Sequence, residues 1–137
     1  LSFTVISFEA WRETLDFMCG SSERNGIVPD AFRESVFLRE GYSSTVFFRT
    51  FAVPHAMNFL AYETKIAVLI PSTPINWETS DVSLVLLLAI NEGDYDDFVR
   101  FYQPLISVLY DRELFTELRS MSSYHEFMKF LDKQISM

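Results

Sequence analysis

Glycine, cysteine and runs of one charge are scarce in this chain of 137 residues. Its four glycines lie apart from one another, so the chain has no glycine-rich loop that would hold a nucleotide phosphate. A single cysteine, Cys19, excludes an internal disulfide and leaves no spacing of zinc ligands. The formal net charge is -8, and its 11 basic residues are dispersed. We therefore expect no direct contact with nucleic acid by this chain.

Long apolar runs are missing as well. The longest, residues 82–90, is far too short to span a membrane and is interrupted by Ser83. No signal peptide is visible, so we expect a cytoplasmic protein without membrane insertion. His55 and His125 are too far apart in sequence to indicate a metal site, and we expect neither metal nor cofactor. The first residue is Leu1, from which we expect a fragment of a longer polypeptide.

The composition is that of a folded protein, with 49% hydrophobic and 16% aromatic residues. The length suits one hydrophobic core, so we predict a single domain over residues 1–137. The nearly continuous apolar run 82–90 predicts a central strand covered on both faces. Around it we expect a mixed sheet with helices on both sides. The predicted helices are residues 7–20, with Ser7 as the cap, residues 27–42, a long helix that follows the turn at 91–98, and residues 111–120 and 122–135. The other predicted strands are one bent strand or two short strands within 45–55, and a strand at 65–70, and we expect a loop at 72–80.

His55 follows a short apolar stretch, Phe51 to Pro54, at the point where regular structure should stop. A lone histidine in this position is most often a structural or surface residue. Residues at the end of a central strand, however, often form active sites in α/β folds. A neutral imidazole is also a good nucleophile near pH 7, since its ordinary pKa is about 6.5. We therefore take His55 as a candidate nucleophile.

Arg39, Ser43, Ser44 and Thr45 precede this histidine. A strand that returns from their turn would bring the guanidinium and the hydroxyls beside His55. Arginine holds phosphate oxygens in a planar fork, and hydroxyls donate to them. With histidine as the acceptor, this set suits phosphoryl transfer. The alternative is that Arg39 is only a cation at a helix end and that the hydroxyls only form a turn.

The string from Ser35 to Ala56, SVFLREGYSSTVFFRTFAVPHA, resembles the active-site region of the mannitol–fructose type of enzyme IIA of the bacterial sugar phosphotransferase system. It has the family's Arg-Glu pair, Ser-Thr step and Ala-Val-Pro-His end, and residues 65–77 and 82–91 are similar to the next two strands and a Pro-Ile-x-Trp loop. The resemblance implies an α/β/α sandwich with a mixed central sheet. It also implies that His55 is the phosphorylated histidine and Arg39 the active-centre arginine, with Ser44 and Thr45 supporting the phosphate.

The second histidine of many such enzymes is missing. Tyr95 and Asp96 lie nearest its place, at the periphery of the predicted site, and His125 offers no replacement. A carboxylate near a phosphoryl group repels it, so onward transfer should suffer. The amino-acid sequence around the site is more similar to the enzyme IIA-like C-terminal modules of transcription regulators.

Three functions follow from this resemblance. In the preferred hypothesis, His55 receives a phosphoryl group from a histidine phosphocarrier protein, and the new charge alters contacts with other domains of a sugar-responsive transcription regulator. The alternative is a transport enzyme IIA, a phosphohistidine carrier that passes the group to a sugar-specific IIB domain. The third is an interaction module that is not phosphorylated. Residues preceding Leu1 would separate the first two.

Overall fold

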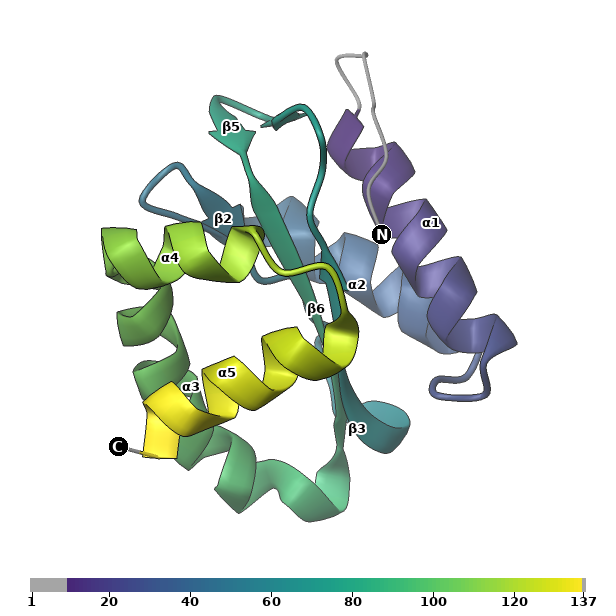
Figure 1. The fold of residues 1–137 in the computed structure, drawn as a ribbon. Helices are drawn as coiled ribbons and strands as arrows, with labels where there is room; N and C mark the ends of the chain where they lie inside the picture. The colour runs from purple at the N-terminus through teal and green to yellow at the C-terminus, as the bar shows by residue number, and fades with distance from the viewer. Residues whose placement is uncertain (1–9, 137) are drawn as a thin grey trace. The chain divides into compact units, whose positions relative to one another are not determined.

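The computed structural model of the chain describes residues 10–136, which divide after Tyr95 into two units (Figure 1). The predicted cap Ser7 and the next two residues lie outside the described part of the chain. The first unit contains α1 (Ala10–Arg24), α2 (Ala31–Tyr42), β1 (Val46–Phe47), β2 (Phe51–Ala52), β3 (Leu60–Leu69), β4 (Ile75–Trp77), β5 (Ser80–Val82), β6 (Leu84–Asn91) and the 3-10 turn η1 (Glu92–Asp94).

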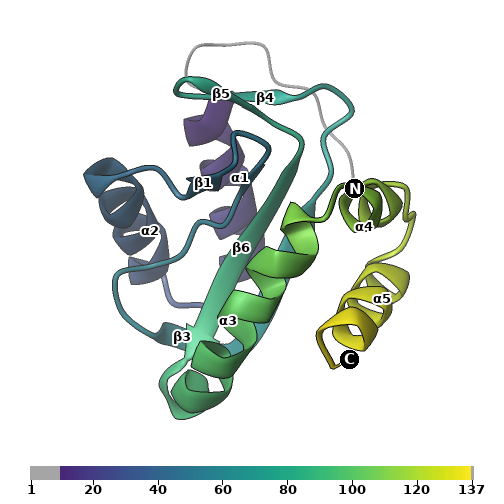
Figure 2. The same cartoon turned by 90° about the vertical axis from the view of Figure 1, so that its left-hand side faces the viewer.

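Four strands of this unit form one sheet in the order β1-β2-β6-β3. β2 runs parallel to β6, whereas β1 pairs with β2 and β3 with β6 in antiparallel fashion. The sheet is therefore mixed, as the sequence predicts. β6 lies inside it (Figure 2), and all of its residues except the last are buried. A strand that is buried on both faces carries apolar residues at every position instead of alternating apolar and polar ones, which explains the apolar run.

The helices α1 and α2 lie together on one side of this sheet (Figures 1 and 2). Each has an apolar face at helical spacing, and the two faces meet the side chains of β6 that point toward them. The shared core includes Leu15 of α1, Val36 of α2 and Val85 and Leu87 of β6, all without exposed surface. Cys19 is buried in the same core, and burial raises the pKa of its thiol to about 12.

The segment 72–80 is not the loop that we predicted. Its residues Ile75 to Trp77 pair with Ser80 to Val82 as a second, two-stranded sheet. Ile75 and Trp77 are buried while Asn76 between them is exposed, which is the alternation of a strand. Glu78 makes the tight turn with a φ of 59°. This hairpin could not be predicted from the sequence, because its strands are short and its turn contains neither glycine nor asparagine.

The second unit is helical and contains α3 (Tyr95–Tyr110) except for its first residue, α4 (Arg112–Arg119) and α5 (Tyr124–Ser136). Side-chain caps start two of them. The Asp111 side chain accepts from the Leu114 N–H at 3.1 Å, and Ser123 Oγ accepts from the Glu126 N–H at 3.1 Å. Within residues 10–136, no helix is long and apolar enough to cross a membrane.

Candidate functional site

His55 lies three residues beyond β2, where it forms a single parallel bridge with Leu88 of β6. The N–H of Leu88 donates to the carbonyl oxygen of Pro54 at 2.9 Å, which holds the backbone just before the histidine. Proline suits this position, because it has no N–H that would need a partner and its carbonyl oxygen is the acceptor of this bond. The histidine is thereby fixed beside the central strand, with its ring half-buried.

The imidazole has a defined orientation. Its Nδ1 atom lies 2.9 Å from the carbonyl oxygen of Val53. A carbonyl oxygen accepts only, so Nδ1 carries the hydrogen of this bond. In the neutral ring the lone pair is then on Nε2, and Nε2 is the nucleophilic nitrogen.

The charge state of His55 is set mainly by burial. Burial lowers its pKa below the ordinary value of about 6.5. The hydrogen bond to Val53 opposes this shift, the positive charge of Arg39 adds to it, and the negative charge of Glu40 opposes it. Because the net direction is downward, the ring is neutral near pH 7 and its Nε2 lone pair is available.

The lowered pKa predicts a loss of stability in acid. The unfolded chain binds the His55 proton more readily than the folded chain, so the free energy of unfolding falls as pH drops from about 6.5 toward the lower folded pKa. We expect the His55→Gln variant to lose less stability than the wild type over this range in denaturant titrations. His125→Gln, at an exposed position, is the control. Equal pH dependence in wild type and His55→Gln would show that His55 is not the responsible group.

Arg39 stands in the last turn of α2, and its charge acts on His55. One guanidinium nitrogen, Nη1, donates to the carbonyl oxygen of Ser43 at 2.8 Å. This bond directs the side chain along the turn after α2 and uses only one of the five N–H donors of an arginine. Ser44 Oγ accepts from the Val46 N–H at 3.1 Å, which leaves its hydroxyl hydrogen to donate elsewhere.

Thr45 joins this turn to the strand that leads to His55. Its carbonyl oxygen accepts from the Val53 N–H at 3.1 Å. Its hydroxyl donates to Glu40 Oε1 at 2.8 Å, and its N–H donates to Glu40 Oε2 at 2.8 Å. The Thr45 hydroxyl hydrogen is thus directed at Glu40. Sequence reasoning named Glu40 only as part of a motif and gave it no role.

Tyr95 and Asp96 occupy the start of α3. Tyr95 is exposed and packs edge-on against Phe59, with ring centroids 5.1 Å apart. Phe59 stands four residues after His55 in the chain, so this contact, within the first unit, joins Tyr95 to the segment that follows the histidine. Asp96, the first residue of the second unit, is exposed in the first turn of the helix.

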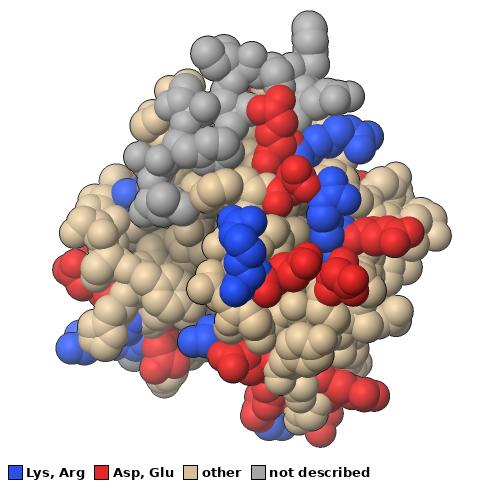
Figure 3. Space-filling view, turned by 90° about the vertical axis from the view of Figure 1, so that its right-hand side faces the viewer, with Lys and Arg blue, Asp and Glu red and all other residues tan. Residues whose placement is uncertain are grey.

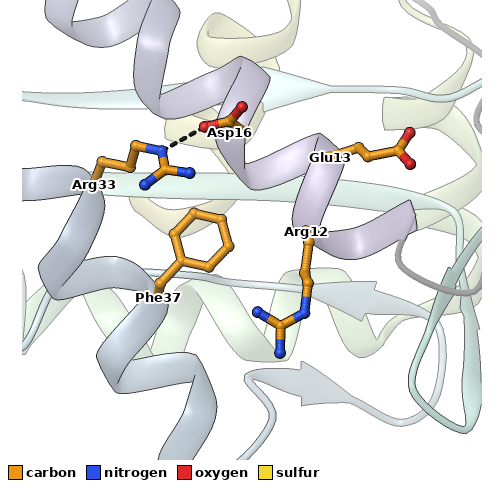
Figure 4. A pocket seen from close by; sticks show the side chains of 5 residues that line it. All are labelled: Arg12, Glu13, Asp16, Arg33 and Phe37. Carbon is orange, nitrogen blue, oxygen red and sulfur yellow. Dashed lines mark hydrogen bonds and ion pairs between the residues drawn. The ribbon is translucent and has the colours of Figure 1, made fainter.

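A surface hollow of about 400 Å³ lies between α1 and α2, lined by Arg12, Glu13, Asp16, Arg33 and Phe37 (Figure 4). It contains none of the predicted site residues. Arg33 pairs with Asp16 and stacks on the ring of Phe37, so its charge is already compensated. Basic and acidic side chains are interspersed on the face shown in Figure 3, where they form no continuous basic patch among the described residues. Such a face does not resemble one that binds a polyanion.

Solved structures share this fold. The mannitol-specific IIA of Escherichia coli aligns with a TM-score of 0.74 at 18% identity, covering 96% of this chain and 93% of that one. The IIA of the E. coli complex with phosphorylated enzyme IIB of the mannitol system aligns with a TM-score of 0.75 at 16% identity, covering 97% and 92%. These alignments span both units, and they confirm the predicted mannitol-type IIA fold.

Two sequence comparisons identify the family. Over 123 residues, or 90% of this chain, the sequence is 28% identical to the probable licABCH operon regulator of Bacillus subtilis (strain 168). The chain spans only 19% of that relative's length. Residues 2–134 match the family model described as phosphoenolpyruvate-dependent sugar phosphotransferase system, EIIA 2. Because this match covers nearly the whole sequence, the chain belongs to the EIIA 2 family of the sugar phosphotransferase system.

Proposed function

We propose that this chain is the phosphoryl-accepting regulatory domain of a sugar-responsive transcription regulator, with His55 as the acceptor. The observation that carries the proposal is the hydrogen bond from His55 Nδ1 to the Val53 carbonyl oxygen at 2.9 Å. It holds the ring in one orientation and leaves the lone pair on Nε2. The donor would be a histidine phosphocarrier protein, which carries the phosphoryl group on a histidine of its own.

The transfer proceeds by attack of Nε2 on the phosphorus of the donor's phosphohistidine. An N–P bond to His55 forms while the donor's N–P bond breaks, and the donor nitrogen leaves with the electron pair. His55 keeps its Nδ1 proton, so the phosphorylated ring carries positive charge beside the Val53 carbonyl dipole. The lowered pKa of His55 supports this step, because the attacking ring must be neutral.

Arg39 and Ser44 have supporting roles in this proposal. The guanidinium of Arg39 acts electrostatically on His55 and holds the oxygens of the transferring phosphoryl group. The Ser44 hydroxyl donates to one of the same oxygens. Thr45 supports the phosphate through its place in the turn, since its hydroxyl points at Glu40.

The regulatory reading draws on the operon regulator of B. subtilis, to which the chain is 28% identical. Phosphorylation adds nearly two negative charges at neutral pH, and a charge change of this size alters contacts with neighbouring domains. We propose such domains in the same polypeptide as partners. The donor works with phosphoenolpyruvate inside the cell, so the proposed location is the cytoplasm. Because the family match spans residues 2–134, we also propose that both units form one domain over residues 1–137.

A transport role is the second candidate, and one solved structure favours it. The E. coli IIA domain that shares this fold was determined in complex with phosphorylated enzyme IIB. In that role the chain would be an enzyme IIA, which passes its phosphoryl group to a IIB domain. The two roles differ in one rate, since a receiver holds the group and a transport subunit must release it quickly.

We predict that the phosphorylated chain transfers its group poorly to IIB domains. In this proposal Tyr95 and Asp96 lie nearest the place of the second histidine of many such enzymes, and neither can supply an imidazole to the phosphoryl oxygens. In single-turnover assays, Tyr95→His or Asp96→His should raise the rate of onward transfer more than the rate of loading. Tyr62→His, at another exposed tyrosine, is the control. Rapid transfer by the unmodified chain would reject the receiver and favour the transport enzyme.

A further inference from the structure

The last turn of α2 places a carboxylate inside the first unit, next to the site. Glu40 is only 1% exposed, although a glutamate is almost never fully buried without partners. Its carboxylate has three: Thr45 N–H at 2.8 Å, the Thr45 hydroxyl at 2.8 Å and Trp77 Nε1 at 2.9 Å. Hydrogen bonds to charged groups are stronger than neutral ones, so this cluster is a firm link.

These bonds close a short loop around the phosphate-binding groups. Glu40 follows Arg39 directly, and its bonds to Thr45 tie the start and the end of the segment that contains Ser43 and Ser44. The same Thr45 accepts from the N–H of Val53, whose carbonyl holds the His55 ring. One buried carboxylate therefore connects the backbone on the Arg39 side of the site with the backbone on the His55 side.

Trp77 anchors this carboxylate in the core. It is 1% exposed, it belongs to the hairpin β4–β5, and its ring lies 6.1 Å from that of Trp11 in α1. Its indole N–H donates to the oxygen that also accepts from the Thr45 N–H. The position of Glu40 is thus set in part by a buried residue of the core, Trp77.

We propose that Glu40 is a positioning residue for phosphoryl transfer: anchored on Trp77, it fixes the turn after α2 so that Arg39 and Ser44 meet the phosphoryl group on His55. This inference rests on the proposed function. Effective catalysis requires such groups to be held in place before the reaction, because ordering them during it costs free energy.

Two conservative substitutions separate the position of Glu40 from its charge. Glu40→Gln keeps the length: its amide oxygen can accept from Thr45 N–H and Trp77, and its amide nitrogen can donate to the Thr45 hydroxyl. Glu40→Asp keeps the charge but is one methylene shorter, so it cannot reach all three donors. The matched controls are Glu34→Gln and Glu34→Asp, since Glu34 is exposed in the first turn of α2.

The readout is the rate of phosphoryl loading from the phosphorylated carrier, measured on folded variants. We expect Glu40→Asp to load about 10- to 100-fold more slowly, because a shift of about 1 Å in positioned groups costs this much. Glu40→Gln and both Glu34 variants should load at close to the wild-type rate. Wild-type loading by Glu40→Asp, or a loss in Glu40→Gln as large as in Glu40→Asp, would overturn the positioning role. An unfolded Glu40→Gln would contradict it too.

Hydrogen exchange separates this inference from the proposed function. In the unphosphorylated chain, the Thr45 amide and the Trp77 indole N–H should exchange faster in Glu40→Asp than in wild type or Glu40→Gln. If the wild type accepts no phosphate, the proposed function fails and exchange alone tests the link. If it accepts phosphate but exchange is equal in all three proteins, only the positioning role fails.

Discussion

The His55→Ala chain is expected to take up no phosphate under conditions in which the wild type takes up one. With phosphoenolpyruvate, enzyme I and the histidine carrier protein, the wild-type mass should increase by a single phosphate that is labile in acid and stable in base. The reason is that, in the proposed mechanism, the Nε2 lone pair is the nucleophile, and the hydrogen bond from Nδ1 to the Val53 carbonyl oxygen leaves that lone pair available. Without that nitrogen no acceptor remains in the site, so the expected effect is complete loss of labelling.

The matched control for this loss is His125→Ala. His125 is exposed at the start of α5, and its replacement should leave labelling intact. Intact-mass measurement with acid and base treatment distinguishes the variants. Labelling that survives His55→Ala would exclude His55 as the acceptor, and labelling lost in His125→Ala would point to the other histidine.

Arg39→Lys is expected to slow loading by about 30-fold, which corresponds to about 2 kcal/mol of transition-state stabilisation. The ammonium keeps the positive charge but lacks the planar fork that binds two phosphate oxygens at once. It also lacks the geometry with which Nη1 of Arg39 meets the Ser43 carbonyl. Since the side chain is partly exposed, thermal stability should change little.

Arg33→Lys gives the matched comparison, since Arg33 lies on the same helix and pairs with Asp16 away from the site. That variant should load at the wild-type rate. Stopped-time loading assays on both variants measure the difference. If Arg39→Lys loads as fast as the wild type, the fork of Arg39 does not hold the phosphoryl group.

The parts of the fold that the sequence predicts well are those with strong local patterns. The run at 82–90 indicates an interior strand, and β6 (Leu84–Asn91) is that strand, although Val82 belongs to β5. The short strands β1 and β2 also stand where β-branched and aromatic residues predict them, ending before Pro54. The position of His55 just after a strand follows from the same pattern, whereas its bridge to Leu88 of β6 depends on a contact between distant segments.

Other features depend on contacts between distant segments. The partner of Glu40, Trp77, is 37 residues away in the chain, so no local pattern predicts the hydrogen bond between them. A signal did exist in α2, where Phe32, Val36 and Glu40 are spaced by four residues and form its buried stripe. An acidic residue in an apolar register indicates a buried carboxylate with partners. Sequence analysis instead selected Arg39 for the site, one position before the residue that the structure buries.

The central claim is that Nε2 of His55 accepts a phosphoryl group. It is tested most directly by nuclear magnetic resonance of the phosphorylated chain with 15N-labelled histidine. We expect coupling of phosphorus to Nε2 of His55, retention of the proton on Nδ1, and unchanged signals from His125. Phosphorus coupled to Nδ1 of His55 or to either nitrogen of His125, or a spectrum without any phosphohistidine after incubation with the complete phosphoryl donor system, would contradict the claim.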